Sequence, residues 1–180
     1  MNKGILVAVL SLVPLTLFAQ ADSQWVLDHS TLSYHMSHPM HEVDGVSHDA
    51  RGKGNCHAGE CQFLIAVPVK SFDSGDTNRD LHMLETTRGA QFPMVVVRAQ
   101  FPESAMTSPT INATLEVQFG GQTAHYNAVQ LQRTAQGAEV RISGTIPTTC
   151  SDFKMDRPSF LTVPIKNEIP VKLDMQWHRM

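Results

Sequence analysis

The stretch Ile111-Asn-Ala-Thr-Leu-Glu-Val-Gln-Phe119 alternates apolar and polar side chains, and Gly120-Gly121 follows it directly. This period-two alternation is typical of a strand with one buried face and one face in water. It indicates an antiparallel sheet, because strands of a parallel sheet are usually apolar on both faces. The two glycines separate this run from another strand-like run at 123–133, so they predict a tight hairpin.

Seven more segments show strand character, at residues 24–36, 43–52, 62–69, 94–101, 123–133, 139–146 and 169–177. Only residues 77–84 predict a helix, where Thr77 and Asp80 have the form of a capping box and Leu81 and Leu84 share a face. Eight strands and one short helix indicate an all-β domain, either a sandwich or a closed antiparallel barrel. The choice matters, because only an eight-stranded barrel leaves room for one small ligand.

The N-terminus has the features of an export signal. Lys3 supplies a positive charge, residues 5–18 are largely apolar, and Ala19-Gln20-Ala21 forms a small-x-small cleavage pattern. We therefore expect a signal peptide at 1–21, a mature domain at 22–180 and a periplasmic location. A retained N-terminal anchor is the alternative, although the apolar run is short for a membrane span.

Charge narrows the range of partners. The formal net charge is −3 and the chain has no basic run, so we expect no nucleic-acid partner. No second apolar stretch is long enough to cross a membrane, so we expect no stable membrane insertion.

Three cysteines suggest two different roles. Cys56 and Cys61 flank a predicted turn, and an exported protein meets oxidising conditions, so we predict that they form a disulfide. The alternative is a reversible redox pair, or soft-metal ligands together with His57. Cys150 is left over, either as a buried inert thiol or as an exposed thiol that could link two chains into a homodimer.

Histidine and methionine cluster between residues 35 and 48. Imidazole with thioether suits copper, and imidazole alone suits zinc or haem iron. His38 and His41 could face one site around Pro39, with His48 arriving from the next strand. This cluster supports an alternative hypothesis, a periplasmic metal- or haem-binding protein.

Several motifs occur in an order that resembles the YceI-like family of lipocalin-like, polyisoprenoid-binding proteins. They are His29-Ser30 with Tyr34 and His38, then Val43-Asp44-Gly45, the segment 71–84 with Arg79-Asp80, the pair Phe92-Pro93, and Ser151-Asp152-Phe153. The chain departs from the family pattern in three places: Cys150 stands for an arginine, Lys154 stands for a glycine, and Arg88-Gly89-Ala90 lies where a double phenylalanine would precede Phe92-Pro93.

The resemblance implies an eight-stranded antiparallel barrel with the short helix near its mouth. It also implies an elongated apolar ligand of the isoprenoid, quinone or fatty acid and amide class, with no further cofactor. The inward faces of the alternating strands, with Met83 from the helix, supply the expected ligand-binding residues: Leu32, Tyr34, Met36, Phe63, Ile65, Val67, Met83, Val97, Phe101, Leu115, Val117, Phe119 and Ile142. A solid interior in which these side chains pack against one another is the alternative.

Enzyme activity is not expected. The chain shows no nucleophile–base–orienter set, no glycine-rich phosphate loop and no paired acids, so we predict no catalytic residues. Arg79 and Asp80 stand at the start of the predicted helix, where we expect them to fix the helix over the barrel.

Overall fold

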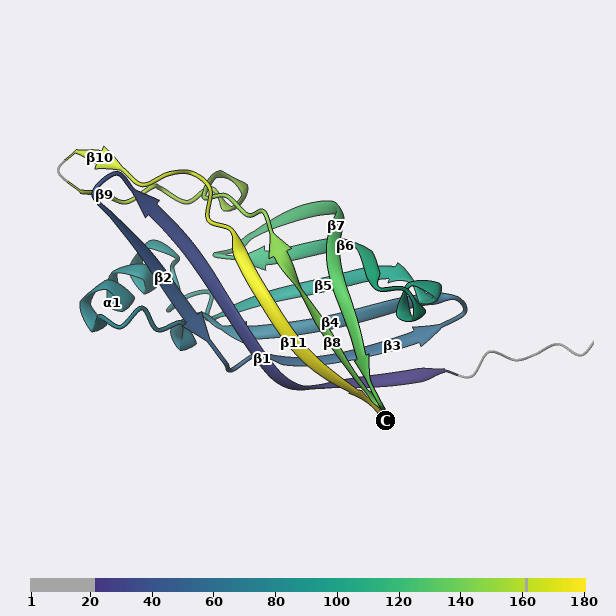
Figure 1. The fold of residues 1–180 in the computed structure, drawn as a ribbon. Helices are drawn as coiled ribbons and strands as arrows, with labels where there is room; N and C mark the ends of the chain where they lie inside the picture. Colours follow the sequence, from purple (N-terminus) through teal and green to yellow (C-terminus); the bar gives the residue numbers. More distant parts are fainter. Residues whose placement is uncertain (1–21, 161) are drawn as a thin grey trace, which may run out of the picture.

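The computed structural model of the protein describes residues 22–160 and 162–180, so the predicted signal peptide lies outside the described residues. Nine antiparallel strands form one sheet that closes on itself through a pairing between its first and last long strands (Figure 1). These strands are β1 (Ser23–His38), β2 (His41–Ser47), β3 (Arg51–His57), β4 (Glu60–Pro68), β5 (Met94–Pro102), β6 (Thr110–Phe119), β7 (Gln122–Gln136), β8 (Glu139–Ile146) and β11 (Val171–Arg179). The predicted barrel is confirmed.

The nine strands occupy eight places around the barrel. β2 pairs with the second half of β1, residues 32–38, and β3 pairs with its first half, residues 23–26. The prediction of one strand over 43–52 is therefore wrong, because the chain breaks at 48–50 as it passes from one half of β1 to the other.

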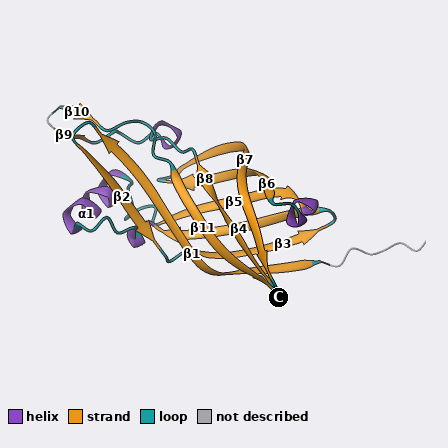
Figure 2. Cartoon of the chain, viewed as in Figure 1, coloured by secondary structure: helices purple, strands orange, loops and turns teal. Residues whose placement is uncertain are grey.

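Short elements cover the two ends of the barrel (Figure 2). They are the 3-10 turns η1 (Val69–Ser71), η2 (Glu103–Thr107) and η3 (Ser151–Phe153), the helix α1 (Thr77–Thr86), and the small hairpin of β9 (Ser159–Phe160) and β10 (Val163–Pro164). Within the described ranges, no helix combines the length and apolar character that crossing a bilayer requires.

Helix α1 begins differently from the prediction. Its N-cap is Asp76, whose carboxylate accepts the backbone N–H of Arg79 at 3.0 Å. The predicted capping box of Thr77 and Asp80 is wrong, because the Asp80 carboxylate turns back to accept the N–H and hydroxyl of Ser74. The N-cap is therefore one residue earlier than the Thr77 that the sequence pattern predicted.

The predicted hairpin at Gly120-Gly121 is confirmed. Both glycines have positive φ, 55° and 76°, and Phe119 pairs with Gln122 across the turn. A two-residue turn with positive φ at both positions matches the twist of the flanking strands, which is why glycine is suited to these positions.

The disulfide between Cys56 and Cys61 is also confirmed. The two residues pair directly across the β3–β4 hairpin and are 1 % and 0 % exposed. Because the two sulfur atoms are bonded to each other, the alternative in which they act as soft-metal ligands with His57 is wrong. The His57 ring instead lies 2.6 Å from the Asp22 carboxylate on the surface.

One end of the barrel is packed solid. Its interior is filled by buried side chains that belong to the hydrophobic core and do not line the large cavity of the other half: Trp25, Cys56, Cys61, Met106, Ile111, Ala113, Val129 and Val140. The predicted alternative of a solid interior therefore holds for this half of the barrel only.

Aromatic packing in the adjoining layer depends on Gly54, whose missing side chain leaves space for Phe63. A Cβ atom at Gly54 would lie 2.5 Å from two ring carbons of Phe63. The ring stacks on Phe101 at a centroid distance of 5.4 Å and meets the edge of Trp177 at 4.9 Å.

Replacing Gly54 with valine is therefore expected to destabilise the domain by about 2 kcal/mol, the usual cost of overpacking a close-packed layer. Urea unfolding monitored by tryptophan fluorescence measures the change. Asn55→Val is the matched control, because residue 55 points outward on the same strand and its change should cost less than about 0.5 kcal/mol. Equal losses in the two variants would contradict the packing argument.

Candidate functional site

The other half of the barrel encloses a cavity of about 270 Å³, roughly twenty times the space that one buried water needs. All thirteen residues that the sequence analysis proposed as ligand-binding line this cavity: Leu32, Tyr34, Met36, Phe63, Ile65, Val67, Met83, Val97, Phe101, Leu115, Val117, Phe119 and Ile142. Several inward-facing side chains among them, such as Val97 and Phe119, are only half-buried although they belong to the barrel interior. Part of their surface therefore faces the hollow.

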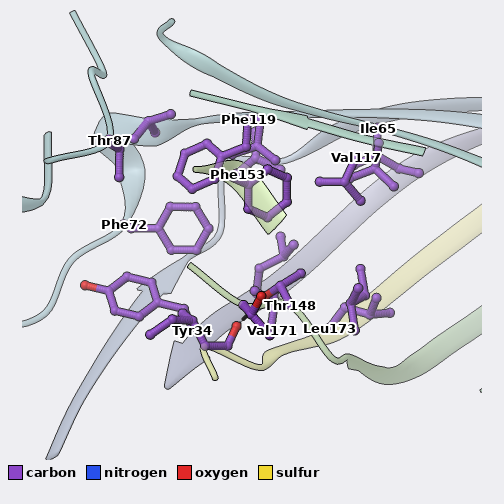
Figure 3. A pocket seen from close by; sticks show the side chains of 18 of the residues that line it. Tyr34, Ile65, Phe72, Thr87, Val117, Phe119, Thr148, Phe153, Val171 and Leu173 are labelled. Atoms are coloured by element: carbon purple, nitrogen blue, oxygen red, sulfur yellow. Dashed lines mark hydrogen bonds between the residues drawn. The ribbon is translucent and has the colours of Figure 1, made fainter. Parts of the chain in front are cut away.

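Aromatic rings gather in one part of the cavity wall (Figure 3). Tyr34 and Phe72 lie 5.7 Å apart by their ring centroids, and Phe119 meets Phe153 edge-on at 5.5 Å. Burial, and then the nearby Asp80 carboxylate, raises the pKa of the Tyr34 phenol, so its hydroxyl stays neutral at physiological pH. The wall as a whole offers apolar surface and few polar groups.

Among the cavity residues that escaped the sequence analysis, two groups show what sequence could and could not reveal. Leu173, Met175 and Trp177 from β11 line the cavity, and their alternation in the sequence could have identified them. Phe153 and Met155 also line it, from an irregular segment after β8 that has no periodic signal. Lys154 between them has φ = 51°, a left-handed conformation that glycine adopts more readily than lysine.

Helix α1 covers one side of the cavity mouth without being packed into the core. None of its residues is buried, yet Arg79, His82 and Met83 all line the cavity. The guanidinium of Arg79 donates to the Ser74 hydroxyl at 2.9 Å and to the Ser74 carbonyl at 3.0 Å. Both side chains fix the turn before the helix, and their expected role in fixing the helix over the barrel stays a prediction.

The β9–β10 hairpin borders the opposite side of the mouth, and His38 connects it to β1. His38 is 4 % exposed; its Nε2 lies 3.1 Å from the carbonyl of Val163, and the Met40 N–H donates to its Nδ1 at 3.2 Å. An N–H donor at Nε2 and an acceptor at Nδ1 satisfy both contacts. A metal ion at either nitrogen would therefore displace a bond that holds the mouth together.

The proposed metal site of His38, His41 and His48 is wrong in its geometry. His38 pairs with His41, and their rings lie 5.0 Å apart. His48 follows Ser47, which pairs with Leu32, six residues back along β1 and thus about 20 Å away. Over residues 22–160 and 162–180, no cluster of three histidine, cysteine or acidic side chains is arranged to hold a metal ion.

Cys150 borders the cavity as a buried free thiol, so the alternative of an exposed thiol that links two chains is wrong. Burial raises its pKa, which lowers the fraction present as the reactive thiolate. We expect a soluble disulfide reagent such as dithionitrobenzoate to modify the native protein at least about tenfold more slowly than the urea-unfolded protein. One slow thiol per chain is the expected stoichiometry, and Cys150→Ser should show none. A fast reaction in the native state would contradict the buried position.

Solved structures share this barrel at low sequence identity. A polyisoprenoid binding domain from Saccharophagus degradans superimposes with a TM-score of 0.68 at 12 % identity, covering 87 % of this chain and 98 % of that chain. BcnA from Burkholderia cenocepacia gives a TM-score of 0.67 at 17 % identity, covering 82 % of this chain and 95 % of BcnA. The YCEI protein of Campylobacter jejuni gives 0.54 at 11 % identity, covering 98 % of this chain and 91 % of that chain. At such identities the likeness shows the fold alone.

Among curated proteins, no sequence matches this chain. Family membership rests instead on a match that runs over most of the described chain, from Trp25 on β1 to Trp177 on β11, and so includes every strand of the closed barrel. With residues 25–177 matching the family's YceI-like domain, the chain belongs to the YceI-like family.

Proposed function

We propose that this chain is an exported binding or carrier protein that holds an elongated apolar molecule inside the barrel and catalyses no reaction. The single observation that carries the proposal is the cavity of about 270 Å³ whose walls are built from apolar side chains. Interiors of this kind are normally close-packed, so a hollow of this size in a small domain calls for an occupant.

A long hydrocarbon tail is the chemistry that such a wall recognises. Each buried methylene contributes about 0.8 kcal/mol, so a ten-carbon segment could contribute about 8 kcal/mol before ordering costs are subtracted. The wall follows β5 from Val95 to Phe101, six residues or about 20 Å of strand, which favours an extended occupant. We therefore propose an isoprenoid, a quinone with an isoprenoid tail, or a fatty acid or amide as the ligand.

The relative from Saccharophagus degradans is described as a polyisoprenoid binding domain, which supports the isoprenoid class for this chain. The export proposal rests on the pattern of residues 1–21, with 22–180 as the mature periplasmic domain. The buried disulfide supports it, because such bonds persist in oxidising compartments.

Organic extraction of the protein, purified without detergent from an exporting bacterial host, tests the function. Mass spectrometry should find one long-chain apolar molecule at close to one per chain. The emptied protein should then bind the fluorescent apolar probe N-phenyl-1-naphthylamine, and the extracted molecule should displace it. An extract without such a molecule, together with no probe binding, would refute the proposal.

A further inference from the structure

Exposed apolar side chains are concentrated at one end of the barrel. The described residues include six large hydrophobic side chains that are exposed, and four of them lie around the cavity mouth. We call these four the mouth rim: Met40, Leu81, Met94 and Val163, exposed by 65 %, 54 %, 38 % and 42 %. The other two, Leu64 and Met180, lie on the barrel side and at the C-terminus. Single exposed apolar residues are ordinary, but their gathering at one opening is not.

Each rim residue comes from a different element that borders the mouth. Met40 lies in the β1–β2 turn, and its backbone bonds to His38, which contacts the carbonyl of Val163 in β10. Leu81 lies on α1, and the next residue of this helix, His82, lines the cavity. Met94 begins β5, where it pairs with Pro68 at the end of β4. In Figure 1, α1, the β1–β2 turn and the β9–β10 hairpin all stand at the left end of the molecule.

The position of the rim indicates what it contacts. The elements that carry the rim also supply cavity residues: His82 and Met83 of α1, and Val95 next to Met94. An apolar tail that enters or leaves the cavity at this end therefore passes close to the rim. A lipid bilayer is the surface that presents apolar tails, and contact with it would spare the tail from crossing water. The charges beside the rim are of both signs: Asp44 and Glu42 lie 2.9 Å and 4.0 Å from His35, and the Arg157 guanidinium donates to the carbonyl of Ile165, next to β10. Because acidic and basic groups both stand beside the rim, the contact rests on its apolar side chains.

We propose that the mouth rim is a docking surface for the interfacial region of a lipid bilayer, against which the protein seats itself to exchange its ligand. The exchange rests on the proposed carrier function, but the docking itself does not require a ligand. The two are therefore measured separately.

Docking is tested by flotation of the mature protein with phosphatidylcholine vesicles, with and without one-fifth phosphatidylglycerol. The rim variant carries Met40→Ser, Leu81→Ser and Val163→Ser; none of these side chains lines the cavity. The matched control carries Leu64→Ser and Met180→Ser, which remove exposed apolar side chains away from the mouth. Partitioning should fall about fivefold for each rim side chain removed and on the order of a hundredfold for all three. The control should partition like the wild type, and the anionic lipid should change little.

A second measurement separates docking from ligand binding. The rim variant should bind N-phenyl-1-naphthylamine from solution with unchanged affinity, yet take it from preloaded vesicles at least about tenfold more slowly than the wild type. If the wild type did not bind the probe, the carrier function would be refuted. The docking proposal would still be tested by flotation.

Three results would overturn the docking proposal. They are wild-type protein that does not float with vesicles, a rim variant and a control that lose partitioning equally, and a wild-type dimer in sedimentation that the rim variant abolishes. The last would assign the rim to a second copy of the chain. Equal melting temperatures of all three proteins establish that the substitutions leave the fold intact.

Discussion

Tryptophan in place of Val97 is expected to abolish most ligand binding while leaving the barrel at least as stable as the wild type. Val97 stands in the middle of the cavity wall, between Ile65 of β4 and Val117 of β6. An indole ring at this position would occupy the space of roughly four methylenes, so the apolar contribution lost is about 3 kcal/mol, or roughly a hundredfold in Kd. Displacement titration with N-phenyl-1-naphthylamine measures the affinity.

The stability of the same variant tests whether the interior is hollow. In a close-packed core the larger ring would cost about 1–3 kcal/mol through overpacking, whereas in a cavity it replaces empty space with contacts. Urea unfolding should therefore show no loss of stability relative to the empty wild type. A loss of several kcal/mol would mean that side chains fill the hollow in solution.

Val96→Trp is the matched control for both measurements. Val96 is the neighbouring residue of β5, pairs with Ala66 and Gln118, and does not line the cavity. Its tryptophan should leave the affinity within about twofold of the wild type, because it points to the outer face of the barrel. If both variants lost binding equally, the cavity would not be the binding site.

Alternation along the strands was enough to predict antiparallel strands and the orientation of their inner face, whereas the choice of a barrel over a sandwich came from the resemblance to the YceI-like family. It could not predict where the interior is solid and where it is hollow. Ile111 and Ala113 are fully buried in the packed end, whereas Leu115 and Val117, further along the same alternating strand, border the cavity. The difference depends on how many side chains the other strands contribute at each height along the barrel axis. The alternation of a single strand carries no information about those side chains.

Two errors of the sequence analysis have a similar origin in long-range contacts. The break between β2 and β3 follows from pairing with two different halves of β1, not from a turn signal at 48–50. The histidine cluster looks compact along the chain, but the antiparallel hairpin of β1 and β2 places His48 far from His38. Residues near one another in sequence are separated here by the 3.3 Å rise of an extended strand.

Removing the disulfide is expected to have the largest effect on stability. The bridge closes a short loop, with a sequence separation of 5, which is worth about 2 kcal/mol in chain entropy. Cys56→Ala with Cys61→Ala also removes two buried sulfur atoms from the packed end of the barrel, at about 1 kcal/mol for each. The total of about 4 kcal/mol should lower the melting temperature by roughly 8–16 °C for a domain of this size.

The cross-link and the packing can be separated by a third sample. Protein with Cys56 and Cys61 intact that is reduced in denaturant and refolded with reductant keeps both sulfur atoms but loses the bond, so it should lose only about 2 kcal/mol. All samples carry Cys150→Ser, which prevents a new bridge to the third cysteine. If the reduced and oxidised proteins had the same melting temperature, the bond would add nothing to the stability of the native domain. Because both cysteines are at most 1 % exposed, dithiothreitol should leave the bond intact until the packed end opens, so the rate of native-state reduction reports the opening of that end.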